Sequence, residues 1–250
     1  MVLAAGEGRR LAPLTWLRPK ALCPVNGVPL VDLALGRVAA TGLLPASTAV
    51  NLHHGAAQLD AHLPSGVHRS FEHPLALGTA GALGALTDWL DGRDVLVTNA
   101  DAWFAGPLDL TGFVEGWDRQ RNRLLCVRAG AGGDFGDHRY CGVALLPASL
   151  VAGLGATPSG LYEVLWHDAW NRGDLDLVTT DVEFVDCGTP RSYLDANLLA
   201  SGGRSVVDES ATVAADATLE RTVVWDHAEV HPGEHLTDAI RGDGWTLLIR

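Results

Sequence analysis

A glycine turn and a group of cations lie close together near the start of the chain. Gly6 and Gly8 directly follow the short apolar run 2–5. Glycines at a strand end let backbone N–H groups approach a phosphate closely. The cations that follow are Arg9, Arg10, Arg18 and Lys20. This combination predicts a site for a polyphosphate.

Lys20 is the only lysine of the chain, since 17 of the 18 basic residues are arginines. A compact ammonium is not equivalent to a planar guanidinium, so a single retained lysine is a candidate functional residue. Two common nucleotide motifs are nevertheless missing. Leu11 stands where a dinucleotide fold has its third glycine, and Ala21 follows Lys20 where a P-loop has Ser or Thr.

Short apolar runs alternate with helical patterns through the first 200 residues, which predicts an α/β domain with a largely parallel sheet. Ligands of such sheets bind at the carboxyl ends of the strands. The expected strands are 2–5, 47–52, 67–71, 94–99, 124–127, 141–146 and 182–185. The expected helices are 29–41, 54–63, 79–90, 161–171 and 190–200.

The pattern changes after the Ser201-Gly202-Gly203 stretch. Aliphatic residues then recur every six positions, which is typical of a hexapeptide β-helix. The two series are Val207, Val213, Leu219 and, after one slip, Val224, Val230, Leu236. We therefore divide the chain into a first domain, 1–203, and a partial β-helix tail, 204–250. So short a tail is expected to pack on the first domain or on a second subunit, which suggests a homo-oligomer.

The composition excludes several classes of protein. A formal net charge of −12 and a pI near 5.1 argue against nucleic-acid coating and against binding to a membrane surface. Neither a membrane-spanning run nor a signal peptide is visible. The four scattered cysteines, Cys23, Cys126, Cys141 and Cys187, predict reduced, packed thiols in a cytoplasmic protein.

The stretch 4–30, AAGEGRRLAPLTWLRPKALCPVNGVPL, resembles the signature of the sugar-1-phosphate nucleotidyltransferases. Three later segments are similar to family elements in the same order. These are Leu77-Gly78-Thr79-Ala80-Gly81, Thr98-Asn99-Ala100-Asp101 and Asp186-Cys187-Gly188-Thr189-Pro190. The resemblance implies a Rossmann-like, mixed and mostly parallel sheet flanked by helices, with a short left-handed β-helix at the carboxyl end.

The resemblance also implies the site residues. Arg10, Lys20 and Asp101 match catalytic positions, and Asp101 with Asp186 matches a pair of Mg²⁺ ligands. Carboxylate oxygens suit that ion. The positions that match nucleotide-binding residues are Leu3, Ala4, Ala5, Gly6, Gly8, His73, Gly78 and Thr79.

The sugar phosphate is expected to contact Lys20, Trp103 and Gly142. One departure bears on this pocket: the segment 128–139 is short and glycine-rich, where relatives carry a longer Glu-rich segment that ends in Lys-Pro. The pocket for the sugar is therefore expected to be open, mobile or altered in preference.

The expected reaction joins a nucleoside triphosphate and a sugar 1-phosphate, giving an NDP-sugar and pyrophosphate. A sugar phosphate is already an oxyanion near neutral pH, so the reaction needs charge stabilisation and no general base. The base of the nucleotide stays open among guanine, uracil, thymine and cytosine. Two alternatives also stay open, a non-catalytic nucleotide-binding subunit and a cytidylyltransferase acting on phosphocholine.

Overall fold

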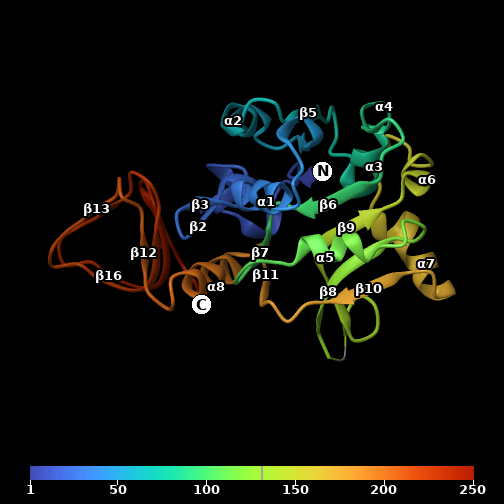
Figure 1. Ribbon diagram of the computed structural model, residues 1–250. Coiled ribbons are helices and arrows are strands. Elements are labelled where there is room, and N and C mark those ends of the chain that lie inside the picture. The colour runs from blue at the N-terminus through green and yellow to red at the C-terminus, as the bar shows by residue number, and fades with distance from the viewer. Residues whose placement is uncertain (131) are drawn as a thin grey trace.

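A seven-stranded sheet organises the first 200 residues of the computed structural model, which describes residues 1–130 and 132–250 (Figure 1). Its strand order is β10-β8-β9-β6-β1-β4-β5. The bounds are β1 Val2–Leu3, β4 Ala49–Leu52, β5 His68–Phe71, β6 Val95–Asn99, β8 Arg123–Arg128, β9 His138–Leu146 and β10 Asp176–Thr179. Within this sheet β9 runs antiparallel to its neighbours and the other pairs are parallel, so the expected mixed, mostly parallel sheet is confirmed.

Helices cover both faces of the sheet, because alternate strand residues are apolar on each side. One face packs on α1 (Leu30–Ala39), α2 (Ala56–His62) and α5 (Leu110–Glu115). The other packs on α3 (Gly78–Gly84), α4 (Thr87–Leu90), α6 (Ala148–Val151), the π-helix Tyr162–Trp166 and α7 (His167–Arg172). Helix α8 (Pro190–Ala200) has the bounds expected from the sequence and begins at a Thr189 capping box.

The single helix expected over 79–90 is divided into α3 and α4. Gly84, at the end of α3, lies so close to another segment that a Cβ there would overlap the backbone of Gly155. The Thr87 hydroxyl then donates to the Gly84 carbonyl at 2.9 Å and caps the break. Apolar spacing alone did not reveal this close approach of two backbones.

Short ladders connect the sheet to the rest of the chain. β2 (Pro24–Val25) and β3 (Val28–Pro29) form a hairpin before α1, and β7 (Ala102–Phe104) pairs antiparallel with β11 (Phe184–Asp186). Short 3₁₀ turns cover Arg9–Leu11, Leu14–Trp16, Lys20–Leu22 and Pro45–Ser47. Among the described residues, no helix combines the length and apolar character needed to cross a bilayer.

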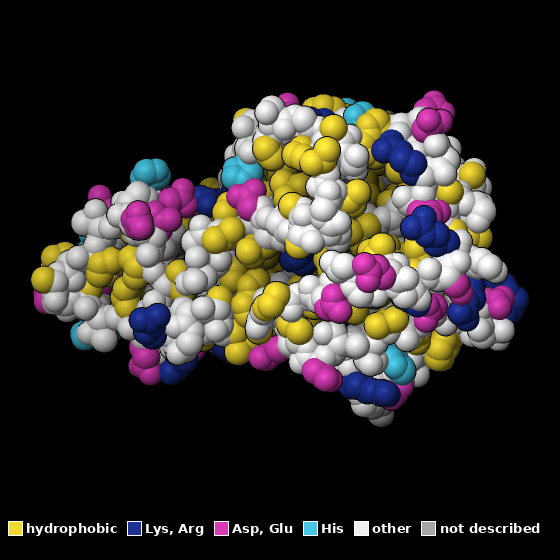
Figure 2. Space-filling view, in the orientation of Figure 1, with side chains coloured by type: hydrophobic (Ala, Val, Ile, Leu, Met, Phe, Trp, Pro, Cys, Tyr) yellow, Lys and Arg dark blue, Asp and Glu magenta, His cyan; other side chains and the backbone are white. Residues whose placement is uncertain are grey.

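The tail is a separate set of strands beyond α8, drawn at the left of Figures 1 and 2. Its strands are β12 Val206–Val207, β13 Thr212–Val213, β14 Thr218–Val224, β15 Glu229–Val230, β16 His235–Gly242 and β17 Trp245–Leu248. The pairs β12–β14, β14–β16 and β13–β15 are parallel, and residues pair with those 17 positions later, as Thr218 does with His235. Of the six-residue series, only Val207 lies outside the small interior that these strands enclose. A left-handed β-helix stays a prediction.

The tail shares a hydrophobic core with the first domain. Leu11, Tyr193 and Trp225, from the signature segment, α8 and the tail, belong to one buried cluster and are at most 3% exposed. The tail therefore packs on the first domain, as expected, while the homo-oligomer stays a prediction.

All four cysteines are buried and free, as the sequence predicts. Burial raises the pKa of Cys23 and of Cys126 to about 12, and it raises the pKa of Cys141 and of Cys187 as well. At pH 8 about one in ten thousand of the first two thiols would be thiolate, which is the reactive form.

We predict that iodoacetamide at pH 8 leaves the four thiols of the native protein unmodified over an hour, while all four react in guanidinium chloride. Intact mass measures both results. Since these pKa values are raised by folding, the stability that the protonated thiols contribute is present below pH 9 and is lost as the pH rises towards 12. Rapid native labelling at any of the four would contradict the packing described.

Candidate functional site

The glycine turn begins where β1 ends, at the middle of the sheet. The Ala4 N–H donates to the Asn51 side-chain oxygen on β4 at 2.7 Å, which fixes the first residue of the turn. Gly8 has φ +63°, and a Cβ there would lie 2.7 Å from the Thr15 methyl and 3.2 Å from the Lys20 Cβ. Glycine at this position therefore lets the turn fold against the lysine.

The two predicted metal ligands are brought together by the β7–β11 ladder. Asp186 ends β11 in register with Ala102, and the Cys187 N–H donates to the Asp101 carbonyl at 3.0 Å. Residues 85 positions apart in the chain are thereby set next to each other at the carboxyl end of β6. The side chains are 30% exposed for Asp101 and 51% for Asp186.

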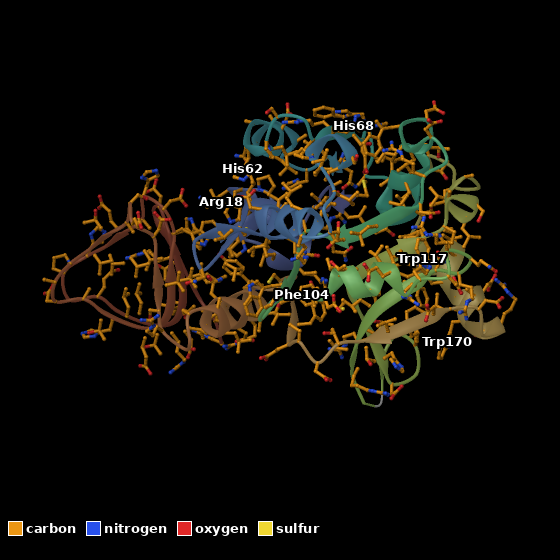
Figure 3. All side chains as sticks on the ribbon, viewed as in Figure 1. Arg18, His62, His68, Phe104, Trp117 and Trp170 are labelled. Atoms are coloured by element: carbon orange, nitrogen blue, oxygen red, sulfur yellow. The ribbon has the colours of Figure 1, made fainter. Side chains whose placement is uncertain are left out.

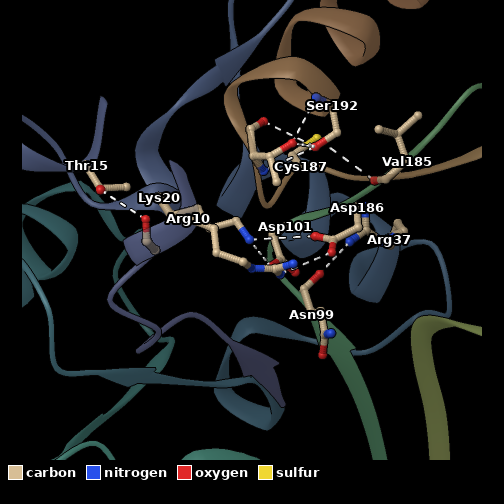
Figure 4. Close-up of polar contacts among 12 residues, drawn as sticks. Arg10, Thr15, Lys20, Arg37, Asn99, Asp101, Val185, Asp186, Cys187 and Ser192 are labelled. Carbon is tan, nitrogen blue, oxygen red and sulfur yellow. Dashed lines mark hydrogen bonds and ion pairs between the residues drawn. The ribbon is translucent and has the colours of Figure 1, made fainter. Parts of the chain in front are cut away.

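Lys20 lies between these carboxylates (Figure 4). Its Nζ donates to Asp101 and lies 3.7 Å from Asp186 Oδ1. The lysine side chain is 12% exposed, whereas Arg10, whose guanidinium is 3.5 Å from Asp186 Oδ2, is 72% exposed. Gly188 leaves room for this approach, since a Cβ there would lie 2.9 Å from both Arg10 and Asp186. The structure thus joins four residues singled out in the sequence.

A cavity of about 200 Å³ opens beside Lys20 and Asp101. Its wall contains most of the residues expected to bind the nucleotide. They are Leu3, Ala4, Ala5, Gly6, Gly78 and Thr79, together with Asn51, Glu72 and Asn99. An adjoining cavity of about 390 Å³ shares Leu3, Gly78, Thr79 and Asn99 and extends to Tyr140, Glu163 and Trp166.

Asp101 and Asp186 fit a Mg²⁺ site that a substrate completes. Among the residues described, no group of three His, Cys, Asp or Glu side chains could hold a metal by itself. Mg²⁺ is commonly bound by one or two carboxylates with the remaining positions filled by water and substrate phosphates. Two partly exposed carboxylates beside the glycine turn are consistent with that arrangement.

Arg37 is a residue of this site that the sequence analysis did not identify. Its guanidinium donates to the Asn99 carbonyl at 3.0 Å and to the Thr98 hydroxyl at 3.2 Å (Figure 4). Burial lowers its pKa to about 10, so it remains a cation behind Asp101 at neutral pH. A signal existed: Arg37 lies seven residues after Leu30 and three after Ala34, on the apolar stripe of α1.

Glu72 and Asn51 form a buried polar link beneath the cavity. The Glu72 carboxylate, 1% exposed, accepts from the Asn51 side chain at 2.8 Å and from the Leu77 N–H at 2.7 Å. Asn51 in turn holds Ala4. Glu72 therefore links the glycine turn to the loop before α3. A polar residue inside the apolar run 49–52 is the signal that could have revealed this link.

Four expected nucleotide or sugar-phosphate contacts, Gly8, His73, Trp103 and Gly142, line neither of the two cavities. His73 is exposed, with its ring 6.5 Å from that of His53. Trp103 is 7% exposed and packs in the cluster shared with the tail, because β7 directs it away from the site. Gly142, with φ +82°, lies beneath Asn99 and Ala102, where a Cβ would be 2.8 Å from the Ala102 Cβ. Their roles stay predictions.

Comparisons with known proteins cover most of the chain. A family described as MobA-like NTP transferase domain matches residues 1–170. The N-acetylmuramate alpha-1-phosphate uridylyltransferase of Caulobacter vibrioides is 34% identical over 162 residues, 60% of this chain and 66% of that protein. The mannose-1-phosphate guanylyltransferase of Mycobacterium tuberculosis is 26% identical over 98% of this chain and 79% of its own length.

Solved structures share the fold at lower identity. A mannose-1-phosphate geranyltransferase, so described, from Thermus thermophilus superposes with a TM-score of 0.73 at 18% identity. That match covers 99% of this chain and 93% of the other, so it includes the tail. UDP-glucose pyrophosphorylase from Acinetobacter baumanii gives a TM-score of 0.62 at 18% identity, over 79% of this chain and 91% of its own.

We predict that Glu72→Ala lowers the free energy of unfolding by about 2–6 kcal/mol, because one buried and one half-buried donor lose their acceptor at about 1–3 kcal/mol each. Chemical denaturation measures the change. Glu72→Gln, which keeps an acceptor oxygen, should lose less. Glu115→Ala, at an exposed position, is the matched control and should change stability by under about 0.5 kcal/mol. A Glu72→Ala variant as stable as the control would show that the link is dispensable.

Proposed function

Since the chain belongs to the MobA-like NTP transferase domain family, we propose that it joins a nucleoside triphosphate to a sugar 1-phosphate, releasing pyrophosphate. The observation that supports this best is the convergence of Lys20, Asp101 and Asp186 beside the cavity that begins at the glycine turn. We further propose that residues 1–203 form the transferase domain and 204–250 its tail.

The chain's own groups suit the demands of that reaction. An oxygen of the sugar phosphate attacks the α-phosphorus, a new P–O bond forms, and the bond to the β-phosphate oxygen breaks as pyrophosphate leaves. The N–H groups of the turn after Ala4 would bind phosphate oxygens. Lys20, within reach of both carboxylates, would neutralise the reacting phosphates, and Arg10 would hold the departing pyrophosphate.

Nucleotidyltransferases of this family generally use a divalent metal, and we assign Asp101 and Asp186 as its ligands. When bound there, Mg²⁺ would supply positive charge at the α-phosphate as the leaving group departs. The backbone hydrogen bond from Cys187 to Asp101 would keep the two carboxylates at a fixed separation. Arg37, which donates to the Asn99 carbonyl, would hold the turn that carries Asp101.

The acceptor is proposed to be a sugar phosphate because the second cavity adjoins the first and is lined with aromatic rings and one carboxylate. Aromatic faces pack against the apolar face of a pyranose, and a carboxylate accepts from its hydroxyls. The relatives' names suggest two pairs to test first. These are UTP with N-acetylmuramate 1-phosphate and GTP with mannose 1-phosphate.

The proposal is tested by measuring pyrophosphate release with Mg²⁺, crossing four nucleoside triphosphates with a panel of sugar 1-phosphates and phosphocholine. We expect release in one nucleotide–sugar combination. Release with CTP and phosphocholine alone would support the cytidylyltransferase alternative. Nucleotide binding without release in any combination would favour a non-catalytic subunit.

In the active combination, Asp101→Asn and Asp186→Asn should each lower kcat by at least about 100-fold, because each removes one of the two carboxylates proposed to hold the metal at the reacting phosphates. Asp195→Asn is the matched control, since this exposed aspartate lies on α8 away from Lys20. Removing the metal with EDTA should abolish release, and added Mg²⁺ should restore it. Undiminished activity in either variant would overturn the assignment of that ligand.

A further inference from the structure

The segment that carries Lys20 makes a direct ionic contact with the tail. The Arg18 guanidinium lies 2.6 Å from Asp226 Oδ1, and its Cζ is 4.4 Å from the centre of the Trp225 ring. Figure 3 labels Arg18 on the side of the N-terminal segment that faces the tail. Among the ion pairs of the described residues, this is the one that joins 1–203 to 204–250.

Burial and hydrogen bonds hold the tail side of this contact in place. Trp225 is 3% exposed, and its indole N–H donates to the Tyr193 hydroxyl at 2.9 Å. That hydroxyl donates in turn to the Pro24 carbonyl, at the start of the β2–β3 hairpin. The Trp225 backbone N–H also donates to the Arg241 carbonyl at 2.9 Å. The indole face is therefore held in place from three elements before Arg18 stacks on it.

The stretch just before Arg18 is the exposed part of this segment. Residues 9–22 contain three short 3₁₀ turns outside every sheet; Leu11 and Leu14 are buried in the cluster shared with the tail, whereas Trp16 and Leu17 are 80% and 53% exposed. Only Pro19 separates Arg18 from Lys20, and a proline ring restricts the backbone. A Cβ on Gly55 would lie 2.3 Å from the Pro19 Cγ, so glycine at position 55 lets the Pro19 ring pack closely. With only this restricted residue between them, we expect a displacement of Arg18 to reach Lys20.

We propose that Arg18 and Asp226 are positioning residues, which hold Lys20 against Asp101 and Asp186 from the tail. The tail then helps to set the geometry of the reaction centre, although none of its residues lines either of the two cavities. Only the expected effect on turnover rests on the proposed function. The positioning of Lys20 by Arg18 and Asp226 does not. Misplacement of a reacting group by about 1 Å can cost about 100-fold in rate, so a weak contact can have a large effect on turnover.

The single lysine provides a readout that is independent of activity. Protein labelled with ¹³Cε-lysine gives one side-chain resonance, from Lys20. We expect Arg18→Met and Asp226→Ala to shift or broaden this resonance in the same way, and the double variant to add nothing further. In the active substrate combination, kcat should fall about 10-fold or more in each variant, and the double variant should match Arg18→Met.

The matched control is Asp238→Ala, which breaks the bidentate Arg221–Asp238 pair within the tail. It should leave the Lys20 resonance and kcat unchanged, although it removes a similar ion pair. Arg18→Lys, which keeps the charge, should retain more activity than Arg18→Met.

An unmoved Lys20 resonance with unchanged kcat in both Arg18→Met and Asp226→Ala would overturn the proposal. Equal changes in Asp238→Ala would also overturn it, since general loosening of the tail would then explain them. If the wild type releases no pyrophosphate with any pair but the resonance still responds, the proposed function fails and the coupling stands.

Discussion

The site depends on one backbone hydrogen bond, from the Cys187 N–H to the Asp101 carbonyl. It extends the β7–β11 ladder by one step, and through it two carboxylates from the middle and the end of the first domain become neighbours. Two like charges so close need a cation between them, and Lys20 provides it. The glycine turn, Arg10 and Gly188 are then arranged around that triad, each within packing distance of one of its members.

The cations of the site differ in burial, which suggests that they act on the ligand in different ways. Arg37 is half-buried behind Asn99, the Lys20 side chain is 12% exposed, and Arg10 is 72% exposed. A buried cation raises the potential of a site without leaving its place, whereas an exposed one can follow a ligand that enters or leaves. Arg37 is therefore expected to act as a fixed positive charge, and Arg10 as a charge that can move with the ligand.

The sequence predicted the parts of this site that depend on local pattern. Apolar periodicity located most strands and gave the bounds of α8. The signature segment identified Lys20, and the later segments that resemble the family identified Asp101 and Asp186. It did not show that Glu72 is held by Asn51 and Leu77, or that Trp103 faces the tail, because these depend on which strands are neighbours. The close approach of Gly84 to the Gly155 backbone was missed for the same reason, since the two residues are distant in sequence.

The wide sequence separation of the triad has a consequence for the newly made chain. During translation Lys20 is made first, Asp101 next and Asp186 much later. The strand that pairs with β7 is among the last parts of the first domain to be made. A ribosome-bound chain that ends before β11 holds the glycine turn and one carboxylate, with neither the ladder nor the second carboxylate. The site is therefore complete only after β11 has been made and has paired with β7.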